Sequence, residues 1–230
     1  VEVERSLRVL DGCVAVFCAV GGVEPQSETV WRQASRYGVP RIAFVNKMDR
    51  VGADFARVVD EMRQKLAATP VPIQIPIGAE DRYSGVIDLV AMEQVSFGGK
   101  QGELAVRSPI PPNLLADAKA AHDRMIESLA DLDDEVAASY LEGKEVPIEK
   151  VREVLRKGTI ANRIQPVVCG SALRDKGVVL LLDAIVDYLP SPLDIPPVKG
   201  FKPGTEEPDE REPDPKGPFS ALVFKVAMID

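Results

Sequence analysis

The chain has 230 residues and a mass of 25.0 kDa, enough to bury the core of one or two domains. Hydrophobic residues make up 45% of it and charged residues 28%, a balance that excludes a disordered or fibrous protein. Aromatic residues are only 5% and the formal net charge is -8, so the chain has no overall attraction for nucleic acid. We expect no DNA binding and, at most, local contacts with RNA.

The sequence carries no signal for a membrane or an oxidising compartment. Its longest apolar runs, such as residues 13–20, are too short to span a bilayer, and no signal peptide opens the chain. Cys13, Cys18 and Cys169 lie in strand-like runs and are predicted to be reduced core residues. Those cysteines lack zinc spacing and the single histidine, His122, is distant, so we predict a cytoplasmic protein without a metal site.

Strand and helix patterns alternate over the first part of the chain. Residues 13–20 form a continuous apolar run, typical of a strand buried on both faces of a parallel sheet. A helix is predicted over 27–37 with Gly38 as its C-terminal cap, then a buried strand over 41–45 and a helix over 54–66. The predicted inner faces hold Val30, Trp31 and Ala34 on the first helix, and Phe55, Val58, Val59, Met62 and Leu66 on the second.

Residues 68–162 change in character and are predicted to be an inserted α+β subdomain. The run 71–77 contains two prolines, which favours an edge strand. Two short antiparallel strands are predicted at 86–90 and 93–97, with a turn at Gly98 and Gly99. Amphipathic helices are predicted over 114–132, 135–141 and 148–161.

The alternating pattern of the first part resumes after the insertion. It predicts a buried strand at 166–169 and an apolar helix at 178–189, which Pro190 ends. The fold class is therefore α/β: a partial parallel sheet with helices, formed by residues 1–67 and 163–190 and interrupted by the insertion. Residues 191–217 are rich in proline and acids and predict an extended linker. One strand, at 219–228, follows and predicts that residues 218–230 begin a second, β-rich domain.

The polar cluster Asn46, Lys47, Met48 and Asp49 follows the predicted strand 41–45, at the sheet edge where parallel sheets bind ligands. A carboxylate such as Asp49 can accept hydrogen bonds from the N1–H and exocyclic amine of guanine. Adenine has no such pair of donors, so it would leave the carboxylate buried and unpaired. Asn46 is expected to tie neighbouring loops together, and the Lys47 stem to cover the base. The alternative is an ordinary polar turn.

A second candidate site follows the strand at 166–169. Gly170, Ser171, Ala172 and Leu173 include small residues that let backbone N–H groups approach a ligand. The Ala172 N–H is predicted to donate to the guanine O6 carbonyl. Together the two clusters predict a guanine pocket formed by Asn46, Lys47, Met48, Asp49, Ser171, Ala172 and Leu173.

These clusters resemble the base-recognition motifs of the GTPase superfamily, and the surrounding sequence is similar to the elongation factor G family of translational GTPases. The similarity runs along essentially the whole chain. It is carried by Val3–Gly12, Phe44–Arg50, Gly52–Phe55, Pro76–Asp81 and Tyr188–Pro192.

The resemblance implies that residues 1–67 and 163–190 are the C-terminal part of a GTP-binding domain and that 218–230 begin a β-barrel domain. It also implies GTP and GDP as ligands, Mg²⁺ in the intact protein, and the ribosome, with its RNA and stalk proteins, as partner. The parent would hydrolyse GTP to move tRNA and mRNA during protein synthesis.

The chain departs from the family pattern in one respect. It contains no G-x-x-x-x-G-K-[ST] phosphate loop, and Gly21–Gly22 does not supply one. The family's magnesium ligands and catalytic histidine would precede Val1, which is not a methionine, so we expect an internal fragment that is inactive alone. No catalytic residue and no metal ligand is assigned.

Two alternatives stay open. The chain could come from a related ribosomal GTPase of the release-factor or ribosomal-protection type, although Arg50 and Gly52–Phe55 favour elongation factor G. As an isolated chain it could be a non-catalytic module that binds the ribosome through the insertion. A dinucleotide-dependent enzyme is disfavoured, because no G-x-G-x-x-G opens a helix.

Overall fold

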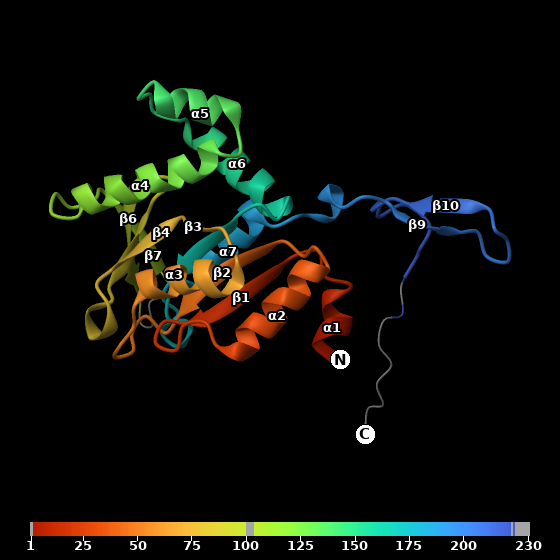
Figure 1. Cartoon of the computed structure of the whole chain (residues 1–230), viewed down its shortest axis with the longest axis horizontal. Coiled ribbons are helices and arrows are strands. Elements are labelled where there is room, and N and C mark those ends of the chain that lie inside the picture. The colour runs from red at the N-terminus through yellow and green to blue at the C-terminus, as the bar shows by residue number, and fades with distance from the viewer. Residues whose placement is uncertain (1, 100–103, 222, 224–230) are drawn as a thin grey trace.

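Four parallel strands form the central sheet of the protein, whose computed structural model describes residues 2–99, 104–221 and 223 (Figure 1). Their order across the sheet is β1-β2-β8-β3. The strands are β1 (Cys13–Cys18), β2 (Arg41–Asn46), β8 (Gln165–Cys169) and β3 (Pro70–Pro72). The predicted α/β fold with a parallel sheet is confirmed, and β3 extends this sheet into the segment predicted as the insertion.

Helices cover both faces of the sheet. They are α1 (Glu2–Leu7), α2 (Pro25–Arg36), α3 (Phe55–Leu66), α4 (Leu115–Ala130), α5 (Asp134–Leu141), α6 (Ile148–Ile160) and α7 (Val178–Tyr188). The sequence predicted α2 to α7 to within a few residues at each end. All five predicted inner-face residues of α3 are buried, and Gly38 has the positive φ of 66° expected of a helix C-terminus.

Strand β2 separates two hydrophobic clusters, because its side chains alternate between the faces of the sheet. Ile42 and Phe44 belong to a cluster that includes α4, α6 and α7, and Ala43 and Val45 to one that includes α2 and α3. The first cluster also contains residues of segment 68–162, which the sequence predicts to be an insertion and which we call the insertion, such as Leu129. The central sheet and the insertion therefore share this first cluster.

Two burial predictions are wrong. Strand β1 lies at the edge of the sheet and Val16 is 58% exposed, so this strand is not buried on both faces. Val30 of α2 is 37% exposed, whereas Trp31 and Ala34 are buried as predicted. An apolar run shows that a strand forms, but its position in the sheet decides what covers it.

The insertion contains a second, antiparallel sheet of order β4-β5-β6-β7. The predicted edge strand 71–77 is divided between the two sheets, and each half, β3 and β4, is an edge strand. Strand β7 was not predicted, and residues 100–103, which precede it, lie outside the described part of the chain. The strands are β4 (Gln74–Ile77), β5 (Gly85–Asp88), β6 (Glu93–Gly98) and β7 (Leu104–Ser108).

The segment predicted as an extended linker contains a hairpin that stands away from the sheets (Figure 1). Strands β9 (Val198–Phe201) and β10 (Pro208–Arg211) pair antiparallel, and Gly204, with a φ of 77°, lies in the turn between them. Of the strand predicted at 219–228, residues 222 and 224–230 lie outside the described residues, and 219–221 and 223 form no strand.

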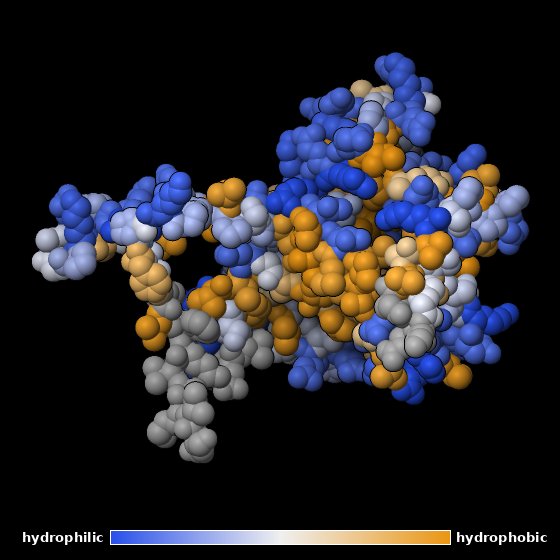
Figure 2. All heavy atoms as spheres, turned by 180° about the vertical axis from the view of Figure 1, so that it is seen from behind, coloured by the Kyte–Doolittle hydropathy of each residue, from blue (hydrophilic) through white to orange (hydrophobic). Residues whose placement is uncertain are grey.

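Apolar residues gather on the back of the molecule, as Figure 2 shows. The outer face of α7 contributes Val179, Leu182 and Val186, of which Val186 is 77% exposed. None of the helices within the described ranges is long and apolar enough to cross a membrane.

Candidate nucleotide site

The two polar clusters predicted as a site meet at the carboxyl edge of the central sheet. We call residues 46–49 the NKMD loop and residues 170–173 the GSAL loop. They follow β2 and β8, which are neighbours in the sheet. The Met48 N–H donates to the Gly170 carbonyl at 3.1 Å, and the Gly170 N–H donates to the Val45 carbonyl at 3.0 Å. The structure therefore brings the loops together as the sequence predicts.

Asn46 joins the loops through its side chain. Its Oδ1 accepts hydrogen bonds from the Lys47 N–H at 2.8 Å and from the Ala172 N–H at 3.0 Å. The second bond links positions that are 126 residues apart in sequence. This is the tie between neighbouring loops that the sequence predicts for Asn46.

The same contact affects the role predicted for Ala172. Its N–H is directed at Asn46, so a ligand carbonyl must share this donor or displace it. The next N–H, that of Leu173, makes no hydrogen bond to any residue in the described part of the chain. It belongs to the short 3₁₀ turn Ala172–Arg174, whose Leu173 side chain is 79% exposed. Among the described residues, the Leu173 N–H is therefore a free backbone donor at this edge, next to the Ala172 N–H that Asn46 already engages.

Asp49 supplies the carboxylate of the site. Its side chain is 19% exposed, and the nearest cation is the Arg174 guanidinium, whose Nε lies 3.9 Å from Asp49 Oδ2. Arg174 is itself 68% exposed, so this pair is weak. The Asp49 carboxylate is therefore not neutralised by a tight ion pair with Arg174.

Lys47 and Met48 differ in their roles. Lys47 is exposed and has a φ of 66°, a left-handed conformation that is rare outside glycine and common at functional sites. Met48 is only 1% exposed and belongs to the core cluster, so it anchors the loop from below.

Ser171 carries an orphaned polar atom. The residue is 1% exposed, and its Oγ has no hydrogen-bond partner among the described residues. A buried hydroxyl without a partner costs free energy, which a ligand atom or water can recover. This atom lies in the GSAL loop, so the residues present fit a polar ligand at this edge.

Glu80 and Lys176 brace the site and were not predicted. The Glu80 N–H donates to the Met48 carbonyl at 2.9 Å, and its carboxylate accepts from the Gly52 N–H at 2.7 Å. Lys176 Nζ donates to the Tyr83 carbonyl at 2.8 Å. These contacts join the insertion to the NKMD loop and to the residues that follow each of the two loops. Only the tertiary structure reveals them, because the partners are far apart in sequence.

Glu61 of α3 fixes the turn that follows β1 at the same edge. Its carboxylate accepts from the Val23 N–H at 2.8 Å and pairs with Arg57 at 2.6 Å and Lys65 at 3.0 Å. The backbone hydrogen bond from Val23, followed by that from Lys65, lowers the pKa of Glu61 below its ordinary value. Gly22 has a φ of 70°, and a Cβ there would lie 2.3 Å from Glu61 Oε2, so the turn requires glycine.

Glu61→Gln is expected to lower the free energy of unfolding by about 1 kcal/mol at pH 7, since the amide keeps the Val23 hydrogen bond but loses both cations. Because the folded-state pKa is lowered, the stabilisation is present above the ordinary pKa and is lost as the pH falls through the folded value. The difference between variant and wild type should therefore shrink as the pH falls below the ordinary glutamate value of 4.5. Urea unfolding across this range measures it.

Glu28→Gln is the matched control, because it breaks only an exposed pair with Arg32 at 3.5 Å. Its unfolding free energy should stay within about 0.5 kcal/mol of wild type at every pH. A pH-independent difference for Glu61→Gln would contradict the linkage.

No group of three or more histidine, cysteine or acidic side chains within the described ranges could hold a metal ion. The Cys169 thiol, below the GSAL loop, is fully buried, and this burial raises its pKa to about 12. It is therefore protonated at neutral pH and lies in the core, as predicted, whereas Cys13 and Cys18 are only partly buried.

Comparisons with known proteins agree with these features. Residues 1–191 match the model of the elongation factor Tu GTP-binding domain family. Elongation factor G 1 of Geobacter sulfurreducens is 56% identical over 231 residues, covering 100% of this chain and 34% of the relative. Elongation factor G of Thermotoga maritima is 53% identical over 227 residues, covering 99% and 33%. The chain thus spans about a third of the length of these relatives.

A solved structure has a similar fold. A crystal structure of a protein from Thermus thermophilus matches with a TM-score of 0.74 and 26% sequence identity. The match covers 85% of this chain and 29% of the other one.

Proposed function

Because the chain belongs to the elongation factor Tu GTP-binding domain family, we propose that its NKMD and GSAL loops bind the guanine base in a translational GTPase of the elongation factor G type. The observation that carries this proposal is the Asn46 bridge between the loops, which sets Asp49 and the Ala172 and Leu173 N–H groups at one sheet edge. Guanine presents two donors, the N1–H and the exocyclic amine, to the carboxylate, and one acceptor, O6, to the backbone N–H groups. Adenine has neither this pair of donors nor this acceptor at the same positions.

Each residue has a part in this recognition. Asp49 accepts from the N1–H and the exocyclic amine, and the backbone N–H of Ala172 or Leu173 donates to O6. Asn46 orients the loops, and Met48 anchors the first loop in the core. The Lys47 stem covers the base, and the Ser171 hydroxyl takes a polar partner in the ligand or its water.

The activity proposed for the whole protein is GTP hydrolysis in the cytoplasm, coupled to movement of tRNA and mRNA through the ribosome. Its partners would be ribosomal RNA and stalk proteins. Mg²⁺ would neutralise the phosphates, but we assign no ligand for it in this chain. The present residues bind and select the base, and none of them is assigned to the hydrolytic step.

The full-length factor tests this function on ribosomes stalled before translocation. With GTP it should advance the mRNA by one codon, measured by primer extension to the ribosome edge. A factor of the release or ribosomal-protection type would hydrolyse GTP without moving the mRNA, and that result would contradict the proposal.

The chain by itself should bind GDP only weakly. Phosphate contacts supply much of the affinity for a nucleotide, and the 230 residues contain no phosphate-loop sequence. Isothermal titration calorimetry should give a dissociation constant well above the micromolar range. Micromolar or tighter binding would show that other residues hold the phosphates.

A further inference from the structure

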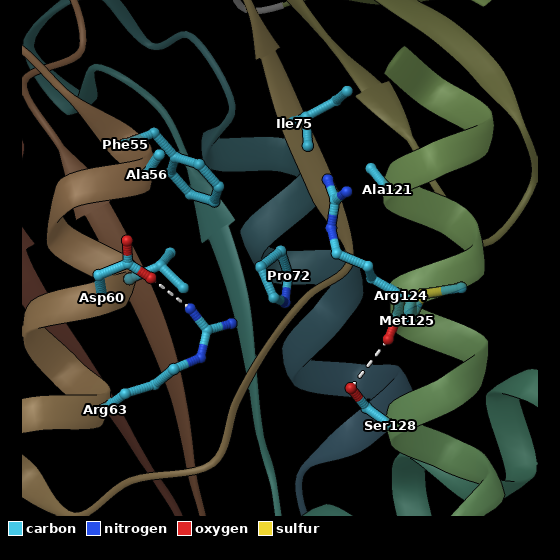
Figure 3. Close-up of a pocket in the computed structure, with 11 residues that line it drawn as sticks. Phe55, Ala56, Asp60, Arg63, Pro72, Ile75, Ala121, Arg124, Met125 and Ser128 are labelled. Carbon is cyan, nitrogen blue, oxygen red and sulfur yellow. Dashed lines mark hydrogen bonds and ion pairs between the residues drawn. The ribbon is translucent and has the colours of Figure 1, made fainter. Parts of the chain in front are cut away.

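A cavity of about 250 Å³ lies between α3 of the core and α4 of the insertion (Figure 3). Its lining is mostly apolar and comes from both parts of the molecule. Phe55 and Val59 line it on α3, and Ala121 and Met125 line it on α4; all four are buried residues. Pro72 of β3 and Ile75 of β4 line it between the helices. The volume lies slightly below the ~300–1,000 Å³ of typical small-ligand pockets, so it suits only a compact ligand.

Two guanidinium groups reach into this space from opposite sides, as Figure 3 shows. Arg63 projects from α3 and is paired with Asp60 at 2.6 Å. Arg124 projects from α4 and forms no ion pair with any residue in the described ranges, although its backbone carbonyl accepts from Ser128 Oγ at 2.9 Å. Asp60 is the one acid among the lining residues that the structure describes.

The charge of the cavity therefore opposes that of the chain. Two arginines and one aspartate give it a local excess of one positive charge, whereas the chain carries a formal net charge of -8. A guanidinium recognises a carboxylate with two parallel hydrogen bonds. Arg124 is available for such a pair, and the apolar walls offer contact only to an apolar group.

We propose that this cavity binds a small carboxylate with a compact apolar body, of the size of 3-phenylpropionate. The apolar body lies against Pro72 and Ile75, the half-buried apolar residues between the helices, and the carboxylate pairs with Arg124. Because the walls come from α3 and from α4, the ligand also fastens the insertion to the core. The site is separate from the NKMD and GSAL loops, so this binding does not depend on the nucleotide.

Titration of the ¹⁵N-labelled chain with 3-phenylpropionate, followed by NMR, tests the proposal. We expect saturable shifts of the amides of Ala56, Ala121 and Ser128, with a dissociation constant of roughly 1 mM or below. The neutral analogue 3-phenylpropionamide should bind about tenfold more weakly, because it lacks the charge-assisted hydrogen bonds.

Three variants distinguish the contribution of the Arg124 charge to binding from that of the shape of the cavity. Arg124→Met should abolish the preference for the acid over the amide, whereas Lys119→Met, on the same helix but outside the cavity, should keep it. Ala56→Phe, at an exposed position of α3 that lines the cavity, should fill the space and prevent binding of both compounds. Thermal unfolding of each variant without ligand verifies that it folds.

Several results would overturn the proposal. They are no saturable binding, equal affinity for acid and amide, an unchanged preference in Arg124→Met, or shifts centred on another surface such as the outer face of α7.

Discussion

Asp49→Asn in the full-length factor is expected to weaken GDP binding by about 100-fold or more, because an amide cannot accept both guanine donors. The same variant should gain affinity for xanthosine diphosphate, whose 2-oxo group accepts a hydrogen bond from the new amide. Isothermal titration calorimetry with each of the two nucleotides measures the change. The exchange of preference is a stronger result than a loss of binding, since a misfolded variant cannot produce it.

Asp54→Asn is a suitable control for this experiment. Asp54 precedes α3, and its carboxylate accepts from the Arg57 N–H at 3.0 Å as the helix N-cap. Asparagine caps helices about as well as aspartate, so neither stability nor nucleotide preference should change. If Asp49→Asn used GTP as well as wild type, the role assigned to Asp49 would be wrong.

Gly170→Ala is expected to have the largest effect on stability among small changes at the site. A Cβ at this position would lie 2.3 Å from the Lys176 carbonyl oxygen and 2.9 Å from the Phe44 ring. The first atom is backbone and the second belongs to the buried core, so neither can move freely. We expect a loss of about 2–3 kcal/mol and a fall in Tm of roughly 5–10 °C.

Gly200→Ala provides the comparison, because no heavy atom lies within 4 Å of a Cβ built at that position. Its Tm should stay within about 2 °C of wild type. Calorimetry measures the Tm of wild type and of both variants. An equal Tm for Gly170→Ala and wild type would contradict the close packing of the GSAL loop.

The sequence predicted elements well where one physical cause determined them. Helix α3 was predicted with its whole buried stripe, because five apolar residues at helical spacing leave no other face to bury. The edge strand at 71–77 was recognised by its prolines, which cannot donate in the middle of a sheet. The meeting of the NKMD and GSAL loops followed from their positions after buried parallel strands.

Predictions failed where the burial or the contacts of a residue depended on segments distant in sequence. The apolar run of β1 predicted two covered faces, but this strand lies at the edge of the sheet. Strand β7 was missed because its side chains are mostly exposed and show no alternation of burial. The braces from Glu80 and the orphaned hydroxyl of Ser171 arise from contacts between distant segments, which no local pattern encodes.

The apolar interior shared by core and insertion determines how the molecule comes apart. Ile42 and Phe44 of the central sheet lie in one cluster with Leu129 and Leu155, so neither part can lose its packing while the other keeps it. Heating should give one cooperative transition with equal calorimetric and van't Hoff enthalpies. Excision of the insertion would remove α4 and α6 from the cluster that covers one face of β2, the strand that leads into Asn46, so we expect the proposed base site to be disturbed with it.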